Sequence, residues 1–325
     1  MADIAMKPSG GMPGAAAASA AEEHERLSQL LASAHERTAK RRHASGIALR
    51  WLVCLGTALT MAVLAGIVGY ILVMGVPRLT PSLFEWEYNS MNVSLMPALI
   101  NTILMAALSL LIAVPISVGS AIYLVEYAGR GNRFVKLVSV TTETLAGIPS
   151  IVYGLFGMLF FVTALHWGMS LLAGACTLAI MILPIIMRTT QEALLAVPDD
   201  YRMGSFGLGA GRLRTVARVV LPSAIPGILG GVILGLGRVV EEVAALLFTC
   251  GSVAAVPDFA GQGLGAVFSS TRTLAEHMYL LASEGLHINE TYATAVVLLA
   301  LVVVLNAVST YFANRLARNA TGEGR

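Results

Sequence analysis

The sequence has few charged residues. Only 12% of its 325 residues are charged, whereas about a quarter are charged in an average soluble domain. In contrast, 56% are hydrophobic, and a water-soluble chain of this size cannot bury that much apolar surface in its own core. Lipid must therefore cover part of the surface, and the composition predicts an all-α membrane protein.

Cysteine is scarce as well. The three cysteines, Cys54, Cys176 and Cys250, lie far apart and form no CxxC pair, so we expect neither a disulfide framework nor a metal site. The histidines form no HExxH motif and no acid–base set, and no catalytic residue is predicted. The sequence contains no nucleic-acid recognition motif. It also lacks a Walker A loop, so any ATP must be bound by another chain.

Long apolar runs are what the sequence does contain. A helix needs roughly 20 apolar residues to cross the hydrocarbon of a bilayer. Six runs meet this length, and together they form a predicted transmembrane domain over residues 47–318. The runs lie near 48–76, 97–125, 135–163, 168–190, 219–249 and 290–314.

The remaining residues form a polar extension and a short tail. Residues 1–46 are rich in glycine and alanine and then in charge, and we expect a partly disordered cytoplasmic extension. Because the first apolar run begins deep in the chain and is about 25 residues long, it is expected to stay as an anchor, unlike a signal peptide. Residues 319–325 form the predicted cytoplasmic tail.

Basic residues alternate between the loops. Nearly all of the 21 lysines and arginines lie in the N-terminal segment, the second and fourth loops and the C-terminal tail, whereas the other loops contain only Arg78 and Arg272. Cytoplasmic loops carry the excess of basic residues in membrane proteins. We therefore expect both termini and the loop 191–218 in the cytoplasm.

The loop 191–218 has a pattern of its own. Asp199 or Asp200 is suited to begin a helix, a glycine-rich turn follows at 207–211, and a basic segment starts at Arg212. The turn allows two short helices to fold back on each other, which predicts a compact knob. Composition alone leaves an ordinary solvated linker equally open.

The fifth apolar run combines glycine with charge. At about 100° per residue, Gly227, Gly231 and Gly235 share one helix face with Arg238 and Glu242. A stripe of small residues at four-residue spacing is where another helix approaches closely. We therefore predict helix packing at the three glycines, with Arg238 pointing into the bundle or along a seam with a partner.

A charge within the bilayer needs an explanation. It costs at least about 2.5–3.5 kcal/mol at the centre of a membrane helix and is by default a candidate functional group. One interpretation is that Arg238 contacts an anion on its way across, with Glu242 as its counter-charge and Glu241 modulating the pair. The other is an i,i+4 ion pair that only fixes packing.

The cytoplasmic loop resembles the coupling motif of ABC-importer permeases. That motif starts with Glu-Ala-Ala, has glycine six residues on and ends in Leu-Pro. Here Met203-Gly204-Ser205 stands at the start, Gly209 at the glycine and Leu221-Pro222 at the end, with matching spacing throughout. The resemblance implies a type I ABC-importer architecture in which this knob sits in a groove of an ATPase subunit.

Two further runs resemble phosphate-importer permeases of the PstA type. Gly237 to Thr249 matches their Arg-x-x-Gly-Glu-Thr-Ala-Pro-Leu-Leu-Phe-Thr run at the arginine, the second glutamate and the last four residues. It departs from the run at Glu241, Val243 and Ala245. The run from Glu143 to Gly157 is similar to their third-span signature. The resemblance covers about residues 47–318 and implies a substrate pathway that includes Glu143.

The resemblance also implies a location in a bacterial inner membrane, a cargo and partners. It implies phosphate import with a second, PstC-like permease, a dimer of PstB-like ATPase subunits that bind the ATP, and an external PstS-like phosphate-binding protein. A permease for molybdate, sulfate or phosphonate shares the coupling motif and stays open as an alternative. A secondary transporter is less favoured, because no convincing inverted repeat is visible in the sequence.

Overall fold

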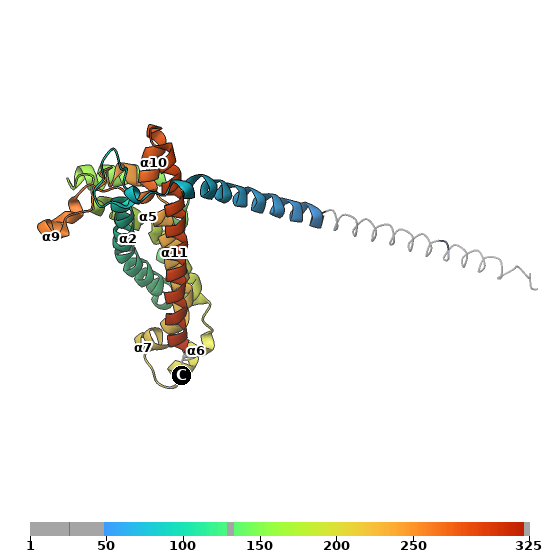
Figure 1. Ribbon diagram of the computed structural model, residues 1–325. Helices are drawn as coiled ribbons and strands as arrows, with labels where there is room; N and C mark the ends of the chain where they lie inside the picture. The colour runs from blue at the N-terminus through green and yellow to red at the C-terminus, as the bar shows by residue number, and fades with distance from the viewer. Residues whose placement is uncertain (1–25, 27–48, 129–132, 322–325) are drawn as a thin grey trace, which may run out of the picture. The chain divides into compact units, whose positions relative to one another are not determined.

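The computed structural model describes residues 26, 49–128 and 133–321, and this described part is helical with no strand (Figure 1). The first long helix is the apolar segment Leu49–Arg78. Ten further α-helices follow it: α2 (Met96–Ile122), α3 (Arg133–Ala146), α4 (Ser150–Gly157), α5 (Leu171–Leu195), α6 (Asp199–Gly207), α7 (Arg212–Thr215), α8 (Leu221–Val240), α9 (Phe259–Gln262), α10 (Leu274–Glu284) and α11 (Ile288–Thr321). Seven 3₁₀ or π segments adjoin them: η1 (Val76–Arg78), η2 (Pro81–Phe84), η3 (Tyr123–Tyr127), η4 (Met158–Ala164), η5 (Val216–Val220), η6 (Leu246–Phe248) and η7 (Gly263–Phe268).

Five of these segments are long and apolar enough to cross a membrane, and a bent pair makes a sixth. The prediction of an all-α membrane protein with about six spans is confirmed. The five spans are Leu49–Arg78, Met96–Tyr127, Leu171–Leu195, Arg212–Val240 and Ile288–Arg315. The predicted extension 1–46 lies outside the described residues, apart from Arg26.

The third span, which the sequence predicts near 135–163 with a bend or kink at Pro149, is bent at that proline. It consists of Val135–Ala146 and Ser150–Ala164, which meet at an angle of 103°. Pro149 precedes the second half, and the residue before a proline is pushed out of the helical conformation. The Tyr153 hydroxyl donates to the Leu145 carbonyl at 2.8 Å, a hydrogen bond that braces the bend.

The predicted end of the helix in the fifth span is wrong. We expected a helix to residue 249, but α8 ends at Val240 and a turn follows. The Glu242 carboxylate accepts a hydrogen bond from the Ala245 backbone N–H at 3.1 Å. A side chain that captures a nearby backbone donor offers the chain an alternative to a continuing helix. Glu242 therefore caps the turn that leads to η6.

Helix α5 lies at the centre of the core, in contact with α2, α4 and α8. The predicted glycine stripe of α8 faces it: a Cβ added at Gly227 would overlap Ala193, and one at Gly231 would overlap Thr189. At Gly235 a Cβ would press on Ile186. Backbones approach this closely where interfaces carry small residues, so the stripe sets the separation of α5 and α8.

The chain forms two units, Met1–Gly69 and Tyr70–Arg325. In the first unit the described helix is apolar, and its large side chains, such as Trp51, Leu55 and Leu59, are exposed. An exposed surface of this size marks contact with a membrane or with another protein.

The second unit has its loops at two opposite ends. Helices α6 and α7 lie at the end of the unit toward which α11 runs, and α10 lies at the other (Figure 1). The core helices run between these two ends. Polar contacts at the two ends of α2 therefore attach one helix to opposite ends of the unit.

The glycine stripe generates a stability prediction with a built-in control. Gly231→Ala is expected to lower the free energy of unfolding by about 1–3 kcal/mol, because the new methyl group meets the Thr189 side chain close to its Cβ. The matched variant Gly230→Ala has open space around the new methyl and should be neutral or slightly stabilising. Thermal unfolding of the purified protein in detergent measures both. Equal effects would remove the role of Gly231 in spacing the helices.

Candidate functional site

The loop between α5 and α8 is folded as a helix, a glycine turn and a second helix. Helix α6 follows Pro198 and carries Asp199 and Asp200 in its first turn, where carboxylates are favoured by the helix dipole. The predicted knob therefore has well-defined elements on both sides of its turn.

The turn after α6 is a Schellman motif centred on Gly209. The Ala210 N–H donates to the Ser205 carbonyl at 3.1 Å, and the Gly209 N–H donates to the Phe206 carbonyl at 2.9 Å. Gly209 has φ +79°, a left-handed conformation that glycine adopts without steric cost. The two hydrogen bonds satisfy carbonyls that the end of the helix leaves free.

The tip of the loop is exposed and partly apolar. The side chains of Met203 and Leu208 are 67% and 91% exposed, and α6 contains no buried residue. The Ser205 hydroxyl lies 2.8 Å from that of Thr215 and joins α6 to α7. Leu221 and Pro222 begin α8, so the predicted coupling residues run from the knob into a membrane helix.

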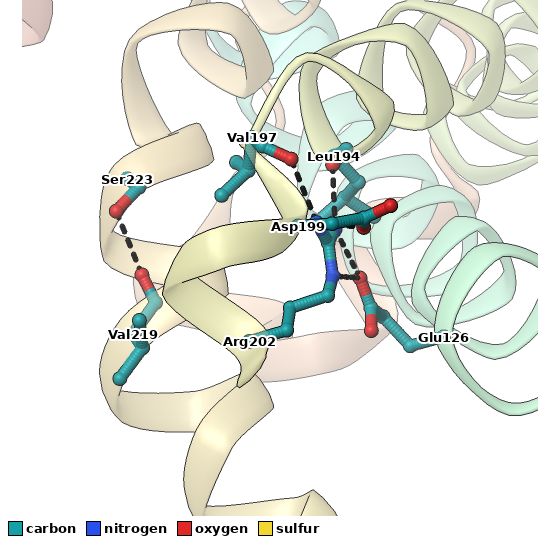
Figure 2. Close-up of polar contacts among 7 residues, drawn as sticks. All are labelled: Glu126, Leu194, Val197, Asp199, Arg202, Val219 and Ser223. Atoms are coloured by element: carbon teal, nitrogen blue, oxygen red, sulfur yellow. Dashed lines mark hydrogen bonds and ion pairs between the residues drawn. The ribbon is translucent and has the colours of Figure 1, made fainter. Parts of the chain in front are cut away.

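Arg202 attaches this loop to the body of the protein (Figure 2). Its Nη2 and Nε donate to Glu126 Oε1 at 2.7 and 3.2 Å. Its Nη2 also donates to the Leu194 carbonyl at 2.9 Å, and its Nη1 donates to the Val197 carbonyl at 2.7 Å. A fourth partner, the Asp199 carboxylate, lies 3.2 Å from Nη1. One guanidinium thus joins α6, the end of α5 and η3, and we call Arg202 and Glu126 the clamp.

The clamp is largely shielded from water. The Arg202 and Glu126 side chains are only 14% and 9% exposed. An exposed ion pair contributes about 0–1 kcal/mol, whereas removing one partner of a buried pair costs about 3–5 kcal/mol, because the other charge stays buried without compensation. Within the described residues, Arg202 is the hydrogen-bond and ion-pair partner of the Glu126 carboxylate.

A second polar group lies at the other end of α8. Arg238 pairs with Glu241 at 3.2 Å and with Glu242 at 3.7 Å. The side chains of Arg238 and Glu241 are 42% and 61% exposed, but that of Glu242 is only 4% exposed. The three charged residues expected on the pathway are therefore neighbours, and the guanidinium keeps an open side. A guanidinium binds oxyanions through paired N–H donors.

Glu143 lies elsewhere, in a cleft of about 340 Å³ between α3 and α5. Arg188 and Glu192, which form an exposed ion pair at 3.2 Å, line the same cleft. The structure thus brings together three of the four predicted pathway residues, and it places the fourth beside an arginine that sequence reasoning did not single out.

A buried polar cluster lies near α10, outside the candidate spans. Glu276 and His277 are fully buried, and Glu276 accepts a hydrogen bond from the Cys250 thiol at 3.2 Å. The Arg272 guanidinium is also buried and lies 4.8 Å from the ring centre of Tyr88. Burial raises the pKa of the Glu276 carboxyl to about 7 and lowers the pKa of His277 to about 3. At neutral pH the histidine is therefore uncharged.

Sequence reasoning missed the clamp. Arg202 directly precedes the start of the coupling motif, and it counted only as one more cytoplasmic positive charge. Glu126 was visible as a carboxylate at the end of an apolar run. A lone acidic residue at such a place is the available signal, but its partner lies 76 residues away and no local spacing connects the two.

These features define a multi-pass helical membrane protein with a folded loop at one end of its bundle, the arrangement of a transport permease. The chain belongs to the family described as binding-protein-dependent transport system inner membrane components, whose model matches residues 113–321. It is accordingly a subunit of an inner-membrane transport system.

Individual relatives refine this assignment. The chain is 33% identical to the Bacillus subtilis protein named "Probable ABC transporter permease protein YqgI", over 71% of this chain and 81% of the relative. It is 39% identical to the Mycobacterium tuberculosis phosphate transport system permease protein PstA 1 over 47% of this chain, an alignment that spans about half of that relative, 49%.

A solved structure supports the fold. The crystal structure of a bacterial ABC transporter involved in the import of the acidic polysaccharide alginate matches with a TM-score of 0.54 at 14% identity. The match covers 79% of this chain and 95% of that one. At this identity the likeness concerns the fold alone.

The Glu276 environment predicts a pH-dependent stability. Between the ordinary pKa of 4.5 and the folded value of about 7, the folded carboxyl keeps a proton that the unfolded chain has released. Glu276 therefore lowers the free energy of unfolding as the pH rises through this range, by roughly 1.4 kcal/mol per pH unit.

The variant Glu276→Gln lacks this titration. The free energy of unfolding of this variant, relative to that of the wild type, should rise from about pH 4.5 to 7. Above pH 7 the difference should change little. Unfolding of both proteins in detergent across this range gives the difference, in which the contribution of His277 cancels. A difference that does not vary with pH would contradict the raised pKa.

Proposed function

We propose that this chain is a permease subunit of an ATP-driven importer of inorganic phosphate and that it contains no catalytic site of its own. The folded loop around Gly209 is the single observation that carries the proposal, because an exposed, internally bonded knob is a surface for another protein to grip. In this proposal an ATPase partner closes on ATP, pulls on the knob and rocks the spans between two arrangements.

The exposed apolar side chains of the loop support a protein partner at this place. Met203 on α6 and Leu208 directly after it are exposed to solvent. The segment around them is too polar overall to enter a membrane. Their burial in a groove of an ATPase subunit would remove apolar surface from water, which is the main driving force of protein association. The loop and both termini then lie in the cytoplasm, and α10 faces the outer side.

Phosphate as cargo is supported by two independent points. Relatives named phosphate transport system permease protein PstA align with about half of this chain. Arg238, with its half-exposed guanidinium and its two carboxylate neighbours, is suited to meet an oxyanion that competes with those carboxylates. Glu143 and Arg188 line a separate cleft that belongs to the same proposed route.

The proposal requires further subunits. A second, PstC-like permease completes the membrane core, and a relative named phosphate transport system permease protein PstC 1 is 29% identical to this chain. A PstB-like ATPase dimer supplies ATP binding, and an external PstS-like protein delivers phosphate. Molybdate, sulfate or phosphonate is the alternative cargo, because all are oxyanions that a guanidinium can bind.

Gly209 provides the test of coupling. Gly209→Val places a β-branched residue at φ +79°, which costs roughly 1–2 kcal/mol and breaks the Schellman geometry. ATP-driven uptake of labelled phosphate into vesicles containing all subunits should fall about tenfold or more, while membrane insertion is kept. Gly207→Ala is the matched control, because a Cβ at Gly207 meets nothing within 4 Å. Normal uptake by Gly209→Val would argue against the coupling role.

Arg238 provides the test of cargo recognition. Arg238→Gln removes the charge at the end of α8 and should lower phosphate uptake by about tenfold or more, with the complex still assembled in affinity purification. Arg315→Gln, a change of an exposed arginine on α11, serves as the control. Wild-type uptake by Arg238→Gln would leave Arg238 with a packing role only.

A further inference from the structure

We propose that the clamp of Arg202 and Glu126 is the link that passes movement of the coupling loop to α2, which makes both residues positioning residues for transport. The inference rests on the proposed function, since it assumes that a partner moves the loop. It identifies the contact through which that movement enters the membrane domain.

The first step concerns how α6 is held. Because α6 contains no buried residue, apolar packing does not fix its direction. Its attachments are polar: the Ser205 hydroxyl contacts Thr215 within the knob itself, whereas Arg202 reaches the Leu194 carbonyl at the end of α5 and Glu126 in η3. A displacement of α6 is therefore transmitted to the body through the guanidinium.

The second step concerns what the clamp holds. Glu126 lies in η3, which continues α2 without a break, so that the span Met96–Tyr127 has 32 residues and a length of about 48 Å. A displacement of Glu126 therefore acts on one end of this long helix.

The third step concerns the other end of that helix, which begins at Met96. There the Asn101 amide donates to the carbonyls of Ala255 and Arg272 at 2.9 and 3.3 Å. The Thr102 hydroxyl accepts from the Leu274 N–H at 2.8 Å, at the start of α10. Helix α2 thus has a polar attachment at each end, one to the coupling loop and one to the segment at the opposite end of the bundle.

The contacts also indicate why arginine is required. Two nitrogens contact the same Glu126 oxygen, and the Leu194 and Val197 carbonyls take further N–H donors. A lysine has one ammonium and cannot reproduce this fork. Glutamine at either position keeps the approximate size but removes the charge that the partner needs.

The test compares uptake per ATP hydrolysed in the complete complex. Glu126→Gln and Arg202→Gln should assemble and hydrolyse ATP, but phosphate uptake per ATP should fall about tenfold in each. The double variant should be no worse than about twofold below the poorer single variant, because both changes break the same contact. Glu284→Gln and Arg78→Gln, two exposed charges away from the clamp, are the matched controls.

Two results would overturn the proposal. One is unchanged uptake per ATP in both single variants, and the other is losses that multiply in the double variant, which would mean that the residues act independently. If the glutamine variants fail to assemble, Arg202→Lys takes their place. It keeps the charge, and its uptake per ATP should still fall several-fold; wild-type coupling in Arg202→Lys would then count against the proposal.

A second measurement does not depend on the cargo. Hydrogen exchange at the amides of η3 should change on ATP binding in the wild-type complex, and this change should be lost in Arg202→Gln. If wild-type vesicles take up no phosphate but the exchange response follows the clamp, the choice of cargo fails and the link stands. If wild-type uptake is normal and the exchange response at η3 is the same in Arg202→Gln as in the wild type, the proposed link is wrong and the proposed function stands.

Discussion

The close approach of helices to α5 is the constraint on which the rest of the structure depends. Inside a bilayer, lipid tails are as apolar as leucine, so helices associate through tight packing and polar contacts in place of a hydrophobic driving force. A Cβ at Gly174 on α5 would meet both Met105 of α2 and Cys250, and one at Gly157 of α4 would overlap Thr177. Because α5 is held on several sides, the Leu194 carbonyl at its C-terminal end is a fixed target for the Arg202 guanidinium.

The clamp and the charged group around Arg238 differ in a way that matches their proposed roles. The clamp is buried and its geometry is specified by four partners, so it suits a contact that must keep its shape under load. Arg238 is half exposed and shares its charge with Glu241 and Glu242. The pair with Glu241 is exposed, and exposed ion pairs are weak and screened by salt, so this arginine can exchange the Glu241 carboxylate for a passing anion at little cost.

Much of this architecture could be predicted from sequence because it depends on local signals. The spans follow from the number of consecutive apolar residues, and the knob follows from the spacing of Gly209 within its loop. Pro149 indicates a bend or kink before Ser150 but not its angle, and hydropathy did not predict the end of α8 at Val240. An apolar run reports that a segment is surrounded by lipid or protein, but not whether a proline or a capping carboxylate divides it. The contact between Glu126 and Arg202 depends on tertiary structure, and one sequence carries no local trace of it.

The Schellman turn at Gly209 has a consequence for the kinetics of assembly. The knob is closed by its own backbone hydrogen bonds, Gly209 to Phe206 and Ala210 to Ser205. In the proposed function, a partner that docks on the knob meets a surface that already has its final form, so little chain entropy is lost on contact. Binding of this kind needs no folding step after encounter. The lifetime of the bound state then depends on how well the two surfaces fit.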